Sequence, residues 1–243
     1  MNLPKLWQTC IEISYDKKAL QRGLESQIKK YKHKEILDCA SGTGFLTLDL
    51  IAKGYNITCS DGSEAMIRAF VKNASAMGLR TKPHKLKWSQ LGARFPGQFD
   101  LVICRGSSLI YAGGWDRPNK NNGKIIEKAL LNFYQCLKPG GVLYVDTTSS
   151  KMIDRELEVN RYKEKTNGAL IDFSETVTLD KIKKLRTWEP IMKVNNKIVY
   201  KFKRYSHYLP HLELRQILND CGFRSVKKVK VDAEHYDVFM VTK

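Results

Sequence analysis

ILDCASGTGFLTLDLIAKGYNITCSD, residues 36–61, has the pattern of a strand, a glycine-containing turn, a helix and a second strand that ends on an acid. A short apolar run ends at Leu37, apolar residues recur at helical spacing over 45–53, and Gly54 stands where a helix C-terminal glycine is expected. Glycines let the backbone approach a ligand closely, and the helix start offers free N–H groups. Asp61 can accept hydrogen bonds from both hydroxyls of a ribose. The stretch therefore predicts a nucleotide-binding unit of a doubly wound α/β fold.

The residues of the turn distinguish between classes of nucleotide. A dinucleotide fingerprint has a third glycine three residues after Gly44, where the helix packs on the strand, but this chain has Thr47 there. An acid four residues before the first of two glycines, here Asp38 before Gly42, is the pattern of S-adenosylmethionine binding. Taken alone, the stretch leaves a purely structural strand–turn–helix open as an alternative.

The length and composition limit the possible classes of protein. A chain of 243 residues suits one large domain, so we expect a single domain over residues 1–243. No window approaches the roughly 20 apolar residues of a membrane span, and the first residues lack the pattern of a signal peptide. The six cysteines show no CxxC pair and no zinc spacing. This favours buried thiols in a reducing cytoplasm and gives no indication of a metal site.

The formal net charge of +17 is distributed along the whole chain. Bases exceed acids in each of the segments 1–35, 36–149 and 150–243. A nucleic-acid enzyme usually concentrates its bases on a stripe or an arm. We therefore expect a lysine-rich solvated surface, while weak attraction to nucleic acid stays open as an alternative.

The rest of the chain alternates between predicted helices and strands. Residues 1–35 predict a helical cap segment before the first strand. Residues 99–104, FDLVIC, form the continuous apolar run of a central parallel strand, and Arg105 to Ser108 follow at its carboxyl end. A helix over 124–137 is stopped by KPGG before another strand at 142–145.

The second half of the chain changes character. Residues 151–168 are charged and predict a helix, whereas residues 169–206 alternate and are rich in β-branched and aromatic side chains. Asn195-Asn196 is a hairpin turn signal, so we expect an antiparallel insertion on the substrate side of the domain. A helix from Pro210 to Gly222 and two strands complete the chain. The expected fold is α/β, with a doubly wound, mostly parallel seven-stranded sheet and an antiparallel β insertion.

Four features occur in one order: the turn at 38–44, Asp61, FDLVICRGSS at 99–108 and LKPGG at 137–141. Together they resemble the class I S-adenosylmethionine-dependent methyltransferases. DCASGTG at 38–44, SDGSEAM at 60–66, Lys87-Trp88 and CRGSS at 104–108 are similar to the glycine N-methyltransferase-like small-molecule branch. The resemblance implies a Rossmann-like methyltransferase fold and S-adenosyl-L-methionine as methyl donor.

The resemblance also implies cofactor contacts at the matching positions. Ala40 and Gly42 would hold the methionine part, Asp61 would bind the ribose hydroxyls, and Met66 and Trp88 would border the adenine. Arg105 and Ser108 would lie between cofactor and substrate. The expected cofactor-binding residues are Asp38, Ala40, Ser41, Gly42, Gly44, Asp61, Gly62, Met66, Lys87, Trp88, Arg105 and Ser108.

The chain departs from this branch at positions that concern the substrate. Ser107 stands where the branch commonly has asparagine, and residues 146–149 lack the arginine that would pair with a glycine carboxylate. Glycine is therefore not the expected acceptor. Enzymes that methylate adenine amino groups carry an Asn/Asp-Pro-Pro-aromatic tetrad where this chain has RGSS, which argues against that class.

Methyl transfer by in-line SN2 displacement requires a positioned acceptor that loses a proton. The candidate proton acceptors are His207, Tyr205 and Asp146. The predicted acceptor contacts are Tyr15, Ser107, Tyr111, Trp115 and Tyr208, whose aromatic members could hold a cationic amine by cation–π contact.

These observations predict a cytoplasmic S-adenosylmethionine-dependent enzyme that methylates a nitrogen of a small amine-bearing metabolite. The alternatives are an O-methyltransferase, an RNA or protein methyltransferase, and a non-catalytic cofactor-binding protein. The sequence does not indicate the oligomeric state.

Overall fold

The computed structural model describes residues 3–149, 157–166 and 168–243. Its main sheet has seven strands in the order β11-β12-β5-β4-β1-β2-β3. The pairs from β5 to β3 are parallel, whereas β12 runs antiparallel to both β5 and β11. This confirms the expected mostly parallel sheet. Its strands are β1 (Ile36–Asp38), β2 (Ile57–Asp61), β3 (His84–Lys85), β4 (Phe99–Cys104), β5 (Leu137–Thr147), β11 (Ser225–Val229) and β12 (Asp237–Thr242).

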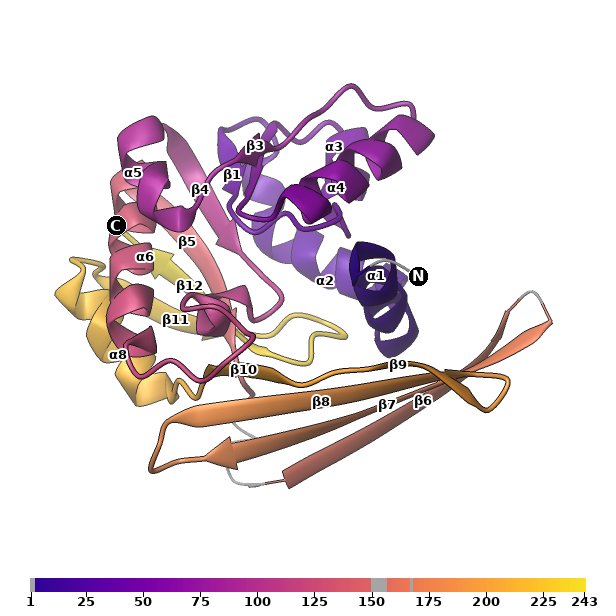
Figure 1. Cartoon of the computed structure of the whole chain (residues 1–243). Helices are drawn as coiled ribbons and strands as arrows, with labels where there is room; N and C mark the ends of the chain where they lie inside the picture. Colours follow the sequence, from indigo (N-terminus) through magenta and orange to yellow (C-terminus); the bar gives the residue numbers. More distant parts are fainter. Residues whose placement is uncertain (1–2, 150–156, 167) are drawn as a thin grey trace.

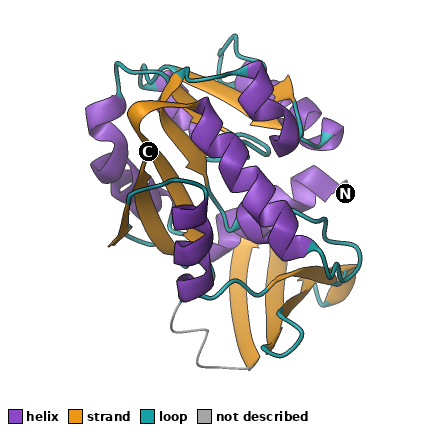
Figure 2. Cartoon of the chain, turned by 90° about the vertical axis from the view of Figure 1, so that its left-hand side faces the viewer, coloured by secondary structure: helices purple, strands orange, loops and turns teal. Residues whose placement is uncertain are grey.

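Helices cover both faces of this sheet (Figures 1 and 2). Neighbouring residues of β4 face opposite cores: Val102 packs in the cluster with Phe133 and Leu214, and Leu101 packs in the cluster with Leu24 and Phe70. The helices are α1 (Leu3–Ser14), α2 (Lys17–Ile28), α3 (Thr47–Ala52), α4 (Glu64–Ala76), α5 (Leu91–Arg94), α6 (Asn122–Cys136) and α8 (His211–Asp220). Short 3₁₀ turns are η1 (Lys29–Tyr31), η2 (Trp88–Gln90) and η3 (Ser108–Tyr111).

A separate antiparallel sheet lies beside the main sheet (Figure 1). Its strands are β6 (Leu157–Thr166), β7 (Ala169–Asp180), β8 (Leu185–Val194), β9 (Lys197–Lys201) and β10 (Arg204–His207). The insertion expected at 169–206 thus starts earlier in the chain. The helix predicted over 151–168 is wrong for 157–166, because those residues pair with β7 along its length. Residues 150–156 lie outside the described part.

Helix α1 packs on the inner face of the antiparallel sheet. Cys10 of α1 shares a buried cluster with Phe173, Trp188 and Met192. On the side of the main sheet, the amide of Asn73 in α4 donates to the Gln8 side chain of α1 at 3.0 Å. The helical segment predicted for 1–35 is present as α1 and α2, and it adjoins both sheets.

Two further properties concern the described residues alone. None of the helices in 3–149, 157–166 and 168–243 combines the length and apolarity of a membrane span. All six cysteines are free thiols and buried, as expected from their apolar surroundings.

Candidate active site

The glycine turn after β1 surrounds a buried carboxyl. Asp38 is 6% exposed and accepts hydrogen bonds from the Thr47 hydroxyl at 2.6 Å and from the Ala40 N–H at 3.1 Å. Burial raises the pKa of Asp38 to about 6. A Cβ on Gly44 would lie 2.6 Å from a Leu48 carbon, so this position requires glycine. Thr47, where a dinucleotide fingerprint has glycine, therefore supplies a donor to the acid of the turn.

Asp61 fastens the same turn to the end of β2. One carboxylate oxygen accepts from the Gly42 N–H at 2.9 Å, and the other accepts from the Ser63 N–H at 2.7 Å. Burial raises the pKa of this carboxyl, and both N–H groups oppose that rise. The Ser41 N–H also donates to the Ser60 carbonyl at 3.1 Å. The Asp61 carboxylate and the Ser60 carbonyl thus fix the turn without any ligand.

Trp88 contacts the other side of the turn. Its indole N–H donates to the Cys39 carbonyl at 2.7 Å, and its ring meets the Phe133 ring edge-on at 5.4 Å between centroids. Met66 is buried in α4, while Lys87 is exposed just before η2. These residues gather near the carboxyl ends of β1, β2 and β3.

A small cavity of about 120 Å³ opens beside the glycine turn. Six of the predicted cofactor residues line it, namely Asp38, Ala40, Ser41, Gly42, Arg105 and Ser108. Phe45, Tyr15 and Tyr236 also contribute to its wall. Among the residues that the structure describes, the other predicted members stay outside this lining: Gly44, Asp61, Gly62, Met66, Lys87 and Trp88.

Asp146 supports the turn after β4. It is fully buried, and its two oxygens accept the N–H groups of Gly106 at 2.8 Å and Ser107 at 2.6 Å. Burial, followed by the nearby Glu234 carboxylate, raises the pKa of Asp146 to about 7. Ser107 has a φ of 53° and a buried hydroxyl with no hydrogen-bond partner among the described residues. The turn therefore depends on side-chain support from β5.

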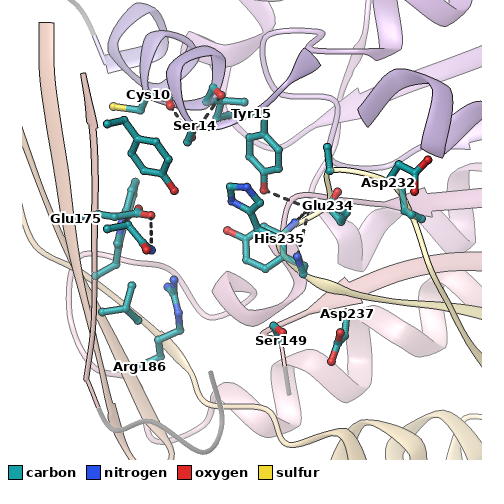
Figure 3. A pocket seen from close by; sticks show the side chains of 18 of the residues that line it. Cys10, Ser14, Tyr15, Ser149, Glu175, Arg186, Asp232, Glu234, His235 and Asp237 are labelled. Carbon is teal, nitrogen blue, oxygen red and sulfur yellow. Dashed lines mark hydrogen bonds between the residues drawn. The ribbon is translucent and has the colours of Figure 1, made fainter. Parts of the chain in front are cut away.

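Glu234, which sequence reasoning missed, joins this region to the loop between β11 and β12. Its carboxylate accepts from the Tyr15 hydroxyl at 3.2 Å and lies 3.6 Å from the Arg105 Nε. The Tyr15 ring stacks on His235 at 4.2 Å (Figure 3). Tyr236 was missed as well, because nothing local marks a residue of a hairpin loop that reaches the site from far along the chain.

A larger cavity of about 1010 Å³ lies between α1, the antiparallel sheet and the β11–β12 loop (Figure 3). Its polar lining includes Tyr111, Glu175, Arg186 and Glu234. It shares three lining residues with the small cavity: Ile11, Tyr15 and Tyr236. The two spaces are therefore neighbours with a common border.

Only some of the residues predicted to contact the methyl acceptor or to accept its proton lie near the cavities. Tyr15 and Tyr111 line the larger cavity, and Asp146 lies behind the turn after β4, whose Gly106 lines the small cavity. Among the described residues, neither cavity is lined by Ser107, Trp115, Tyr205, His207 or Tyr208. His207 instead lies 3.2 Å from the Glu213 carboxylate, and the Tyr205 N–H donates to the Trp115 carbonyl at 2.9 Å.

Comparison with known proteins relates this chain to methyltransferases. The family described as "Methyltransferase domain" matches residues 36–141. The glycine/sarcosine N-methyltransferase of Halorhodospira halochloris is 31% identical over 136 residues, which cover 55% of this chain and 48% of that protein. The chain spans about half the length of the curated relatives it matches.

Solved structures extend the likeness to the whole fold. Streptomyces venezuelae DesVI superposes with a TM-score of 0.78 at 15% identity, covering 99% of this chain and 98% of that one. CalS10, a SAM-bound amino pentose methyltransferase from Micromonospora echinaspora, gives a TM-score of 0.76 at 14% identity and covers 100% and 97%. At such identities the likeness establishes the fold, antiparallel sheet included.

Proposed function

Residues 36–141 form a methyltransferase domain within a class I S-adenosylmethionine-dependent methyltransferase fold, and from this premise we propose that the protein methylates a nitrogen of a small amine-bearing molecule. The observation that carries the proposal is the pair of adjoining cavities. The small one is lined by the glycine turn, and the larger one is enclosed by the antiparallel sheet.

The residues of the turn fit S-adenosylmethionine. Gly42 and Gly44 have φ values of 53° and 89°, and the Asp38 carboxyl beneath them lines the small cavity. Asp38, Ala40 and Gly42 are proposed to hold the methionine part, and Asp61 the ribose. When bound, the cofactor supplies a methyl group activated by a sulfonium. Burial and the fixed turns then let this chain contribute orientation and exclusion of water.

The lining of the larger cavity favours an amine as acceptor. Tyr15, Trp188 and Tyr236 provide aromatic surface there. The lining carboxylates are Glu175, which accepts from the Trp188 indole, Glu234, which pairs with Arg105, and Asp237, which pairs with Lys228. Carboxylates and aromatic faces both attract cationic amines. The names of the glycine/sarcosine N-methyltransferases that this chain resembles also support transfer to nitrogen rather than to oxygen.

An amine that is methylated loses a proton, and a group of the site has to accept that proton. Asp146 is fully buried behind the turn after β4, and its two oxygens are committed to backbone N–H groups. Glu234 lines the larger cavity, where its carboxylate accepts from the Tyr15 hydroxyl and ion-pairs with Arg105. We propose that its negative charge stabilises the cationic amine, and the sequence candidates Asp146, His207 and Tyr205 remain as proton acceptors.

Calorimetric titration with S-adenosylhomocysteine tests the cofactor assignment. We expect binding by the wild type and a loss of about tenfold or more in Asp61→Asn, because hydrogen bonds to a charged carboxylate are among the stronger ones. Asp49→Asn is the matched control, since Asp49 of α3 pairs with Lys17 of α2 and lines neither cavity among the described residues. Absence of binding by the wild type, or equal affinity in Asp61→Asn, contradicts the assignment.

A turnover screen tests the acceptor class. Amines and the alcohols of matching carbon skeleton are incubated with S-adenosylmethionine, and methylated products are detected by mass spectrometry. We expect product from amines. Product from the alcohols alone would favour an O-methyltransferase, whereas tight cofactor binding with no product from any member would favour a non-catalytic protein.

A further inference from the structure

Arg186 stands out on the inner face of the antiparallel sheet. Along β8 the buried residues alternate, so that Arg186 shares one face with Trp188 and Met192. That face packs on Phe173 and Val177 of β7 and on Cys10 of α1, all apolar contacts. Arg186 is nevertheless only 5% exposed, and its side chain extends into the larger cavity (Figure 3). A lone cation among the buried positions of β8 needs a physical reason.

The protein itself satisfies little of this guanidinium. One Nη1 hydrogen bond goes to the Tyr111 hydroxyl at 2.9 Å, and the buried Nε has no hydrogen-bond partner among the described residues. Within the described part of the chain no carboxylate lies in ion-pair range of Arg186. A guanidinium carries five N–H donors and does not lose its charge at physiological pH. Its burial without a directly paired carboxylate is therefore unfavourable unless a ligand supplies one.

Glu175, a carboxylate that lines the same cavity, is engaged elsewhere. It accepts from the Trp188 indole N–H at 2.7 Å and from the Asn160 amide at 3.3 Å. These bonds hold it beside its neighbours on β6 and β8 instead of against Arg186. Arg186 and Glu175 therefore both line the cavity without forming an ion pair with each other.

We infer that the acceptor carries, besides its amine, an anionic oxygen group such as a carboxylate or a phosphate ester, which binds Arg186 and the Tyr111 hydroxyl. This rests on the proposed function. The unused N–H groups of Arg186 match an oxyanion, and Tyr111, which accepts from Arg186, keeps its own proton to donate to the same oxygen group. The amine then lies at the border of the two cavities, near Tyr15 and Tyr236, and the anionic group lies at β8.

The size of the cavity agrees with an acceptor larger than glycine. Its volume of about 1010 Å³ is at the upper end of small-molecule sites, which are roughly 300–1,000 Å³. The arginine also comes from the insertion, not from residues 146–149 after β5, where none is present. Both observations are compatible with an acceptor whose amine and anionic group are several bonds apart.

Binding of matched probes tests the inference without requiring turnover. With S-adenosylhomocysteine present, affinities are measured by calorimetry or ligand-detected NMR for aminohexanoate against its amide, and for O-phosphoethanolamine against ethanolamine. We expect at least one anionic probe to bind about tenfold or more tightly than its neutral partner. The two pairs distinguish a carboxylate from a phosphate ester as the preferred group.

Arg186→Gln should abolish this preference while leaving the affinity for S-adenosylhomocysteine unchanged. Arg204→Gln is the matched control. Arg204 lies on β10 of the same sheet, ion-pairs with Asp116 of the loop before α6, and lines neither cavity among the described residues. Arg186→Lys, which keeps the charge but loses the planar fork, should retain part of the preference. If Arg186→Gln does not fold, Arg186→Lys provides the test in its place.

Two results would overturn the inference: equal binding of every charged and neutral pair by the wild type, or an undiminished preference in Arg186→Gln. Failure of the proposed function has a different signature, since the protein would then not bind S-adenosylhomocysteine or would not transfer a methyl group. The anion preference is measured by affinity alone and is independent of transfer.

Discussion

At the scale of single residues, three aspartates hold the turns around the candidate site, two of them buried, Asp38 and Asp146. Asp38 and Asp61 fix the glycine turn, and Asp146 fixes the turn after β4. The sequence motif located the first two, because an acid at a strand end before or after glycines is a local pattern. The role of Asp146 as an acceptor for two backbone N–H groups could not be predicted, since the turn that it supports lies about forty residues earlier.

Thr47→Val tests the contact between the Thr47 hydroxyl and Asp38. The substitution removes a donor to a carboxyl that is only 6% exposed. We expect a loss of about 1–3 kcal/mol in the free energy of unfolding at pH 8, where Asp38 is ionised, and a smaller loss at pH 5, where it is protonated. Urea unfolding at both pH values measures this. Thr47→Ser keeps the hydroxyl and should retain most of the stability; equal losses in the two variants would contradict the assignment.

Asp146 should make stability depend on pH. Its pKa is raised in the folded protein to about 7, whereas an unfolded aspartate titrates near pH 4, so the unfolded chain releases its proton first. The Asp146 contribution to the unfolding free energy therefore falls as pH rises from about 4 to about 7, by an amount on the order of a few kcal/mol.

Denaturant unfolding of the wild type and Asp146→Asn across this pH range isolates that contribution, because the other titrating groups cancel in the difference. The advantage of the wild type over Asp146→Asn should shrink towards neutral pH. A difference that stays constant from pH 4 to 7 would show that the folded and unfolded pKa values are alike.

At the scale of elements, the nucleotide-binding half was predictable and the antiparallel sheet only in part. Helix α4 begins after the Ser63 cap, and Gly54 and Gly78 adopt positive φ values after α3 and α4, as local rules require. Strand β6 was mistaken for a helix because its charged sequence has no apolar period. Pairing along the whole of β7 decides its conformation, and such long-range contacts are invisible in a single segment.

Arg186 is a second residue whose role depends on long-range packing and could not be predicted from its own segment. The signal was present, as a lone charge in register with the apolar positions Trp188 and Met192 of an alternating strand. Its meaning depends on which face of β8 borders a cavity, and that follows only from the placement of α1 and the β11–β12 loop.

Asn195 closes the β8–β9 hairpin and ties it to β7. Asn195 and Asn196 have φ values of 49° and 63°, and the Asn195 side chain accepts from the Leu170 N–H at 2.9 Å. Asn195→Ala should lower stability by about 1–2 kcal/mol through strain and loss of this bond. Asn196→Gly, which suits a positive φ, should be neutral or stabilising in the same thermal unfolding assay. If Asn195→Ala unfolds like the wild type, the hairpin gains nothing from this residue.

At the scale of the whole molecule, α1 lies between the two sheets and covers the site. Cys10 of α1 is 5% exposed, and burial raises its thiol pKa to about 12. We expect slow alkylation of Cys10 at pH 8, limited by opening of α1, and slower alkylation still with bound S-adenosylhomocysteine, because Ile11 and Tyr15 line the small cavity.

Peptide mass spectrometry gives the alkylation rate at each cysteine. Cys136, buried in the core on the opposite face of the main sheet, is the internal reference and should respond less to the ligand. An unchanged Cys10 rate at saturating S-adenosylhomocysteine would show that α1 does not close over the cofactor site.

The border formed by Ile11, Tyr15 and Tyr236 has an energetic consequence. Side chains that touch both spaces make the two binding equilibria interdependent, so a ligand that orders them for one space alters the free energy of filling the other. Thermodynamic reciprocity then requires a single coupling factor: however much the acceptor changes the affinity for S-adenosylhomocysteine, the latter changes the affinity for the acceptor equally. We therefore expect heterotropic cooperativity between donor and acceptor, which depends on these three side chains.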